Sequence, residues 1–176
     1  MFTKPLKPAM QQAYVKLMMS VIGKGLVVAS HVDPEIQQEI AKFPENFTLS
    51  MKVFPHGPAF IARVNQQKQL ELVDELEGKP DLCIIFKHLE HAFLVFSFQE
   101  STAQAFANDR MIADGDVSSA IRLVRCLNKM EALILPKLIA NLAVKRYPAE
   151  LTLKEKFTGA KNIYLKVAKS YFKRST

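Results

Sequence analysis

The chain has 176 residues, of which 49% are hydrophobic and 23% are charged. This length fits a single domain, and the apolar share is large enough for a packed core, which excludes a mainly disordered chain. The two cysteines, Cys83 and Cys126, lie in apolar segments. They provide neither a disulfide framework nor the spacing of a zinc site, so we expect a reduced, cytoplasmic compartment.

The net charge of +7 is unevenly distributed along the chain. Residues 151–176 contain seven Lys and Arg against one Glu, whereas residues 1–150 contain 17 basic and 16 acidic residues. The body is therefore nearly neutral and the C-terminal segment is strongly basic. A partner attracted by charge is expected to meet that segment.

Targeting and membrane-spanning segments are not expected. The longest apolar stretch, residues 9–32, is interrupted by Lys16 and Lys24 and by two glycines. It falls short of the roughly 18–20 consecutive apolar residues that a span requires. The same lysines argue against a signal peptide. We therefore expect a soluble protein.

The first part of the chain predicts two helices followed by a β-hairpin. Apolar residues recur every three or four positions over residues 14–26, which is typical of an amphipathic helix, although two glycines weaken its end. Residues 33–42 predict a short helix with Asp as N-cap and Pro at its first position. The apolar period then becomes two over residues 47–53 and 60–64, and the Pro-His-Gly-Pro turn at 55–58 joins these strands.

The rest of the body alternates between short strands and helices. The strand Leu82–Phe86 is almost continuously apolar, which favours an interior position in the sheet. Gly115 is expected to form a turn between strand and helix, and Asp116 to cap that helix. In chain order we predict strands at 69–73 and 82–86, helical segments at 89–96 and 103–106, a strand at 111–113, and helices at 117–127 and 133–144.

Recognised catalytic and cofactor-binding motifs are missing from the sequence, including the nucleophile elbow, the P-loop, the dinucleotide-binding glycine pattern and the HExxH zinc motif. His88 and His91 could share a metal, but no third ligand has a fitting spacing. Asp114 and Asp116 could hold a cation or act as acid and base, but we favour the simpler explanation that Gly115 forms a turn and Asp116 caps the following helix. We expect no catalytic residue, no metal and no cofactor.

One segment carries a family resemblance: residues 110–123 read RMIADGDVSSAIRL. This resembles the closing motif of the sterol carrier protein type 2 (SCP2) domain, a short strand ending in Gly-Asp or Gly-Asn before a helix rich in small and aliphatic residues. The hairpin at residues 47–64 falls where that family has its first strands, so the resemblance covers about residues 40–145. The chain differs by an N-terminal helical stretch, a basic C-terminal segment, and a final Arg174-Ser175-Thr176, which does not match the peroxisomal Ser-Lys-Leu signal.

The resemblance implies an α/β (α+β) fold, with about five strands in a largely antiparallel sheet and helices on one side enclosing an apolar tunnel. It divides the chain into an N-terminal helical segment (1–45), a lipid-binding domain (46–148) and a basic amphipathic segment (149–176). Members of the family bind sterols, fatty acids and acyl-CoA. Some bacterial relatives are accessory lipid-binding factors in isoprenoid quinone synthesis.

An elongated apolar cavity between sheet and helices is therefore expected, although the same side chains could simply fill a core. Apolar enclosure alone can bind a hydrocarbon chain, at about 25 cal/mol per Å² of buried area. The candidate lining residues are Met18, Phe60, Ile84, Phe86, Phe93, Phe96, Ile112, Ile121, Val124, Leu127 and Leu138.

The basic segment is expected to be an amphipathic helix. Phe157, Tyr164, Val167 and Tyr171 share one face of it. It either contacts an anionic membrane or docks on the body of the protein, its lysines then being merely solvated. The candidate membrane-contact residues are Lys161, Lys166, Lys169, Lys173 and Arg174.

Three functions follow from these observations. The first is non-enzymatic carriage or presentation of a hydrophobic lipid of the sterol, fatty acyl or isoprenoid/quinone type. The second is an enzyme, or an accessory subunit, of lipid or isoprenoid quinone metabolism. The third is nucleic-acid binding through the basic tail, for which charge is the only support, since neither an RNA-recognition strand pair nor helix-turn-helix spacing is visible.

Overall fold

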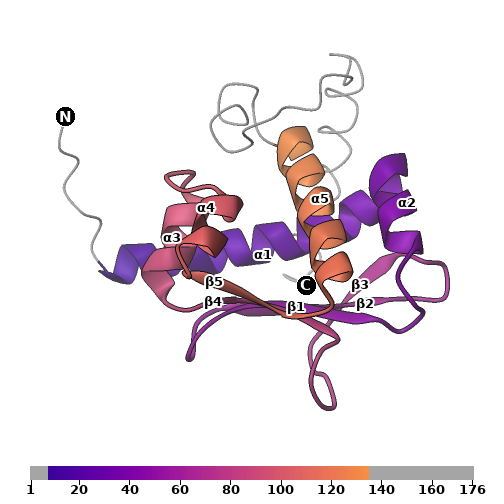
Figure 1. Ribbon diagram of the computed structural model, residues 1–176, viewed down its shortest axis with the longest axis horizontal. Coiled ribbons are helices and arrows are strands. Elements are labelled where there is room, and N and C mark those ends of the chain that lie inside the picture. Colours follow the sequence, from indigo (N-terminus) through magenta and orange to yellow (C-terminus); the bar gives the residue numbers. More distant parts are fainter. Residues whose placement is uncertain (1–7, 135–176) are drawn as a thin grey trace, which may run out of the picture.

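The computed structural model describes residues 8–134, which form a five-stranded sheet and five helices (Figure 1). The predicted elements within this range are present in the predicted order. The predicted helix after residue 134 and the basic segment lie outside the described residues. The elements are α1 (Pro8–Val32), α2 (Pro34–Ala41), β1 (Thr48–Val53), β2 (Ala59–Val64), β3 (Leu70–Val73), β4 (Leu82–Phe86), α3 (Leu89–Phe96), α4 (Thr102–Ala107), β5 (Met111–Gly115) and α5 (Val117–Ile134).

The sheet has the strand order β3-β2-β1-β4-β5. Only β1 and β4 run parallel and the other three pairs are antiparallel, which confirms the expected largely antiparallel sheet. Asp81 joins the starts of the two parallel strands: its Oδ2 accepts hydrogen bonds from the Thr48 backbone N–H (2.8 Å) and hydroxyl (2.7 Å). The apolar β4 is an interior strand, as predicted.

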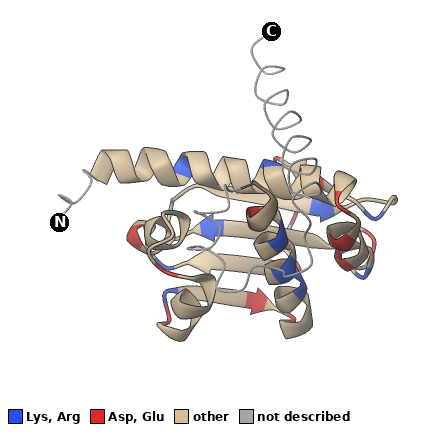
Figure 2. Ribbon diagram, turned by 90° about the horizontal axis from the view of Figure 1, so that it is seen from above, with Lys and Arg blue, Asp and Glu red and all other residues tan. Residues whose placement is uncertain are grey.

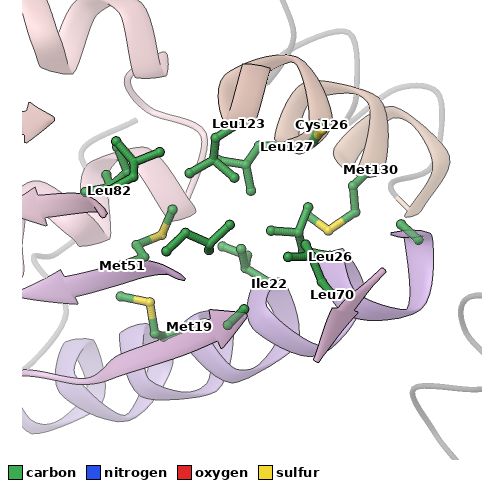
Figure 3. Close-up of a cluster of buried hydrophobic side chains, with 14 of the residues drawn as sticks. Met19, Ile22, Leu26, Met51, Leu70, Leu82, Leu123, Cys126, Leu127 and Met130 are labelled. Carbon is green, nitrogen blue, oxygen red and sulfur yellow. The ribbon is translucent and has the colours of Figure 1, made fainter. Parts of the chain in front are cut away.

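All five helices lie on one side of the sheet (Figure 1). Strand side chains alternate between the two faces, so Leu49, Met51 and Val53 of β1 point toward the helices and are buried. They belong to the same core as Met19, Ile22 and Leu26 of α1 and the buried side of α5. Figure 3 shows Met51 among these side chains. The core is thus a single layer of apolar side chains between sheet and helices.

The length and hydropathy of α1 correct one expectation. Pro8–Val32 is long and apolar enough to cross a membrane by these two criteria, although no such segment was expected. In the structure α1 passes without a break through Gly23 and Gly25 and packs on β2, β3, α3 and α5. Its buried residues belong to the hydrophobic core, so α1 serves this domain as a core helix.

Candidate functional site

A small apolar cavity of about 30 Å³ lies where α1, α3 and α5 meet. The expected cavity lay between the sheet and the helices, but no strand residue lines this one. Its walls are formed by hydrocarbon, aromatic and thioether side chains and by one carboxyl group. The lining residues are Met18, Val21 and Ile22 of α1, Val95 and Phe96 of α3, Phe98 after α3, and Met130 and Glu131 of α5.

Glu131 is the only titratable residue among the described residues that line the cavity. Burial among apolar groups disfavours its charged form and raises the pKa of the carboxyl group to about 7. Within residues 8–134, no hydrogen bond or ion pair reaches this carboxyl group. Glu131 is partly buried, and a carboxyl group in such apolar surroundings without a partner among the described residues is costly; a ligand that supplies a donor would relieve that cost.

The α3 wall is held on α1 by polar and aromatic contacts. The Tyr14 hydroxyl donates to the Phe96 carbonyl at 2.9 Å, across 82 residues of sequence. The Tyr14 ring also meets Phe93 edge-on at 5.5 Å between centroids, and Phe86 of β4 meets Phe96 in the same way at 5.2 Å. These contacts fix the position of Phe96 between the sheet and the cavity.

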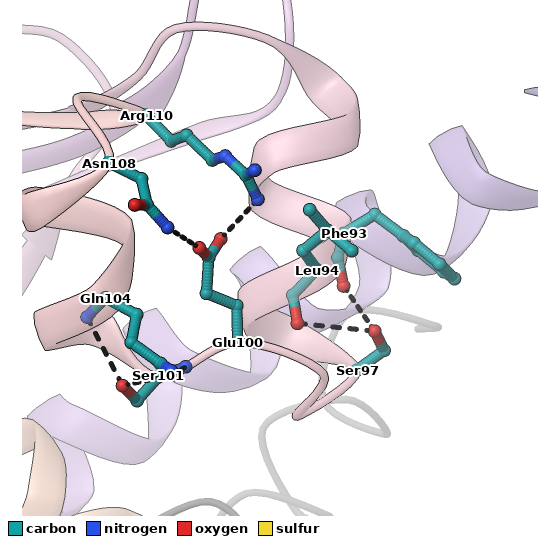
Figure 4. Close-up of polar contacts among 8 residues, drawn as sticks. All are labelled: Phe93, Leu94, Ser97, Glu100, Ser101, Gln104, Asn108 and Arg110. Carbon is teal, nitrogen blue, oxygen red and sulfur yellow. Dashed lines mark hydrogen bonds and ion pairs between the residues drawn. The ribbon is translucent and has the colours of Figure 1, made fainter.

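The turn after α3 brings Phe98 to the cavity. Phe98 has a positive φ of 61°, and the preceding Ser97 hydroxyl donates to the Phe93 carbonyl at 2.6 Å (Figure 4). Glu100 then accepts from Asn108 at 2.7 Å and from Arg110 at 3.0 Å, which ties the turn to the segment before β5. This network shapes the rim of the cavity from polar groups that lie outside it.

The polar side of α5 is held on α2 by ion pairs. Glu39 of α2 pairs with Arg122 at 3.4 Å and with Arg125 at 3.9 Å. One turn earlier on α2, Glu35 pairs with Lys129 at 2.7 Å. Figure 2 shows the basic positions along α5 and the acidic ones on α2. α5 packs on α2 and α1, and its opposite side forms no ion pair with the described residues.

That opposite side carries an exposed apolar row, which we call the α5 stripe: Val117, Ile121 and Val124. Val117 is 72% exposed and Ile121 is 50% exposed, whereas Val124 is partly buried. The spacing of four, three and then seven residues places Glu131 on the same side of the helix. The stripe and Glu131 therefore share one side of α5, with Asn128 between Val124 and Glu131.

A second, larger concavity lies on the other side of α1. This groove of about 870 Å³ runs between α1 and the edge of the sheet formed by β2 and β3. Phe60 lies against Gly23 at its base, and Leu72 of β3 is 42% exposed. Lys16 and Lys24 belong to its α1 wall and Asp74 to its sheet wall. The groove is open and mixed in polarity, unlike the cavity at Glu131.

The predicted lining residues do not converge on one cavity. Met18 and Phe96 line the cavity, Phe60 lines the groove, and Ile121 and Val124 lie on the α5 stripe. Lipid contact stays a prediction for all of them. Of the others, Ile84, Phe86 and Leu127 are buried in the core, Phe93 packs on Tyr14, and Leu138 lies outside the described residues.

The structure corrects the prediction that Ile112 faces the space between the sheet and the helices. It pairs with Ile85 in the register of β4 and β5, while the neighbouring pair Ile84 and Ala113 faces the helices. Ile112 therefore points to the other side of the sheet, where it is 39% exposed. The triplet Met111-Ile112-Ala113 is apolar throughout, so its sequence does not show which residues face the core.

The residues considered as cation ligands, the two aspartates around Gly115 and the histidine pair, form other contacts in the structure. Asp116 accepts hydrogen bonds from the Ser119 backbone N–H (2.8 Å) and hydroxyl (3.1 Å), as predicted for a helix cap. Asp114 forms an ion pair with Lys79 at 2.8 Å. The rings of His88 and His91 contact each other edge-on. In the part of the chain that the structure describes, no three His, Cys, Asp or Glu residues come together as metal ligands.

Sequence reasoning missed Glu131 and most of its neighbours. Val21, Val95, Met130 and Glu131 were not among the predicted site residues. One signal was available: the spacing of Val124 and Glu131 places a carboxylate on an apolar helix face. The depth at which that face lies depends on α1 and α3, which the local pattern does not contain.

No protein-family model matches the sequence, and no curated protein matches it. Among solved structures, the fold is similar to one described as a UbiJ-SCP2 ubiquinone synthesis protein, at 15% identity and a TM-score of 0.44, over 72% of this chain and 99% of that one. It is also similar to sterol carrier protein 2 like 2 from Aedes aegypti, at 16% identity and a TM-score of 0.41, over 64% of this chain and 95% of that one.

A third similar structure is sterol carrier protein domain 2 of Helicoverpa armigera, at 17% identity and a TM-score of 0.40, over 73% of this chain and 94% of that one. All three are SCP2 structures. This is the family that residues 110–123 resemble. The identities are low, and the function proposed below therefore rests on the residues of this chain.

Proposed function

We propose that this protein binds and carries a hydrophobic lipid of the sterol, fatty acyl or isoprenoid/quinone type, without transforming it. The proposal rests on two observations: the exposed α5 stripe, and an apolar cavity lined by Glu131 on the same side of that helix. A hydrocarbon chain on the stripe would remove exposed Val and Ile side chains from water, which is favourable by about 25 cal/mol per Å².

The size of the cavity defines how such a ligand binds. About 30 Å³ accommodates one small group and not a whole lipid. The end of the ligand would enter the cavity and its chain would lie along the α5 stripe. Binding a bulkier ligand requires α5 and α3 to move apart, and α5 is suited to this because its ion pairs hold it on the opposite, α2 side.

Carriage rather than catalysis is supported by the composition of the walls. Of the eight lining residues that the structure describes, seven are apolar and the eighth offers a single carboxyl group. The resemblance of residues 110–123 to the SCP2 motif points the same way. We further propose that the protein is cytoplasmic and meets membranes through its basic segment, where lipid is loaded or presented to an enzyme.

Three matched substitutions test the site. Ile121→Glu places a charge on the α5 stripe, Leu72→Glu places one in the groove, and Ile112→Glu places one on the far face of the sheet. All three side chains are between 39% and 50% exposed, so none should disrupt the core. The measurement is mass spectrometry of an organic extract of each purified, folded protein.

We expect co-purified lipid in the wild type, in Leu72→Glu and in Ile112→Glu, and a strong loss in Ile121→Glu. Lipid lost from Leu72→Glu alone would move the site to the groove. A wild-type extract without lipid, together with no uptake from lipid vesicles, would overturn the proposed function. Retention of RNA or DNA in place of lipid would favour the nucleic-acid alternative.

A further inference from the structure

We propose that the cavity at Glu131 receives the hydroxyl-bearing end of a neutral lipid, so that the protein selects lipid alcohols, sterols or phenols over fatty acid anions. This inference rests on the proposed function and names the ligand class of the same site. The juxtaposition that carries it is one carboxyl group, without a partner in residues 8–134, beside seven apolar side chains from the same part of the chain.

The cavity has the size of a small polar end group. Its volume of about 30 Å³ exceeds the 10–15 Å³ or so that one water molecule needs. A hydroxyl group at the end of a hydrocarbon fits this space. A phosphate or a CoA head group does not, because its several oxygens would face side chains such as Val21, Val95 and Phe98, which offer no donors.

The chemistry of the carboxyl group sets the preference. Ionised, Glu131 is an acceptor only, so a hydroxyl or phenol O–H can donate to it in a charge-assisted hydrogen bond. A fatty acid anion would bring a second negative charge beside the first in a region of low dielectric, and the two would repel. The bound donor also satisfies a group that has no partner among the described residues.

No other charge in the described walls offsets this repulsion. The residues that face Glu131 are Met18, Val21 and Ile22 from α1, Val95 and Phe96 from α3, and Phe98 from the following turn, and none of them titrates. The basic residues of α5 point to α2, where Glu35 and Glu39 pair with them. The preference for a neutral donor therefore belongs to Glu131 alone.

The path to the cavity fits a linear or flat apolar body. Val117 and Glu131 are fourteen residues apart on one side of α5, which corresponds to about 21 Å along the helix axis. Val117, at one end of this side, is 72% exposed, and Glu131, at the other end, is partly buried and lines the cavity. A lipid with one polar end would therefore bind with its hydroxyl at Glu131 and its tail toward Val117.

The test compares two probes that differ only in the end group, hexadecan-1-ol and hexadecanoate. Radiolabelled forms of both are measured by equilibrium dialysis against the full-length protein at pH 8.5 and pH 5.5. The proteins are the wild type, Glu131→Gln and Glu131→Leu, each checked for folding by circular dichroism. For each protein, the affinity for the alcohol is divided by the affinity for the acid. The wild-type ratio is then divided by the ratio of each variant, which cancels differences in the solubility of the two probes.

At pH 8.5 we expect the wild-type ratio to exceed that of either variant by about tenfold, equivalent to about 1.4 kcal/mol. At pH 5.5 Glu131 is protonated, and the difference should shrink. Ratios that agree within twofold across the three proteins at pH 8.5 would overturn the inference and leave lipid binding intact. Failure of folded wild type to bind either probe would overturn the proposed function itself.

Discussion

Gly115 lies so close to Asp81 that a side chain cannot fit between them. A Cβ atom at Gly115 would be 2.5 Å from the Asp81 carbonyl oxygen and 3.0 Å from the Cα of Leu82, its partner in β4. Its φ of 145° is also a conformation that L residues rarely adopt. This glycine thus lets β5 approach β4 at the point where α5 begins.

Gly115→Ala should lower the free energy of unfolding by about 2–4 kcal/mol, because both the backbone conformation and a backbone contact oppose the methyl group. Gly78→Ala is the matched control. Gly78 also has a positive φ, 91°, but no atom lies within 4 Å of its Cβ position. It should cost only about 1 kcal/mol. The free energy of unfolding of both variants is measured in urea. Equal losses in Gly115→Ala and Gly78→Ala would contradict the explanation by close contact.

Glu131 should make stability depend on pH. Its pKa is about 7 in the folded protein against an ordinary value of 4.5, so the folded state holds this proton more tightly than the unfolded state. The free energy of unfolding therefore falls as pH rises from about 4.5 to 7. Above pH 7 the stability that the protonated carboxyl group provided is fully lost. Glu131→Gln should stabilise the protein at pH 8 by on the order of 2–3 kcal/mol and have little effect at pH 4.5.

Urea unfolding of both proteins at the two pH values checks this expectation. Comparison of the variant with the wild type at each pH removes the contributions of the other titrating groups. A constant difference between the two proteins across this pH range would show that Glu131 is solvated in the folded state, and would remove the electrostatic basis for selecting a neutral ligand.

The ion pairs between α2 and α5 should contribute modestly and with the opposite pH dependence. The hydrogen bond and charge of Lys42, with the charges of Arg125 and Arg122, lower the pKa of Glu39. The resulting stability is present above about pH 4.5 and is lost as pH falls. Glu39→Gln should cost about 1 kcal/mol or less at neutral pH, and less still in high salt.

Glu45→Gln is the matched control for that variant, because Glu45 is exposed and has no ion pair among the described residues. The free energy of unfolding of both variants is measured by chemical denaturation at low and at high salt. A Glu39→Gln effect no larger than that of Glu45→Gln at low salt would mean that the ion pairs of Glu39 do not stabilise the packing of α5 on α2.

The cysteines should be inert in the folded protein. Burial raises the pKa of the Cys126 thiol to about 12, so the reactive thiolate is scarce at neutral pH, and Cys83 is buried in the sheet. A thiol reagent should label neither within the time that it labels both in denaturant. Rapid labelling of one thiol in the folded protein would reveal local opening at that residue.

Local patterns predicted the elements well and the site poorly. The alternation in residues 47–53, the apolar run of β4 and the capping role of Asp116 each depend on a few neighbouring residues, and the structure confirms all three. Gly23 was expected to weaken its helix, yet it lies where the Phe60 ring approaches to within 2.9 Å of its Cβ position. Its small size lets α1 pack on β2, which a local pattern cannot show.

The candidate site depends on contacts between distant segments. Glu131 acquires its apolar surroundings from α1 and α3, which lie more than thirty residues earlier in the sequence. The position of Ile112 depends on the register of β5 against β4, and a shift of one residue would reverse its face. Hydrophobic periodicity identifies a buried face, but it does not show whether that face fills a core or lines a cavity.

The basic segment, which lies outside the described residues, should attract the protein to anionic membranes. Each Lys or Arg near such a surface contributes about 1 kcal/mol, so replacing Lys161, Lys166, Lys169 and Lys173 with Gln should greatly weaken binding to anionic vesicles. Replacement of the same four residues with Arg keeps the charge and should preserve binding. Flotation with anionic and neutral vesicles at low and high salt measures the effect. Equal flotation of the Gln and Arg variants would show that this segment has no electrostatic role at the membrane, and would favour its docking on the body of the protein.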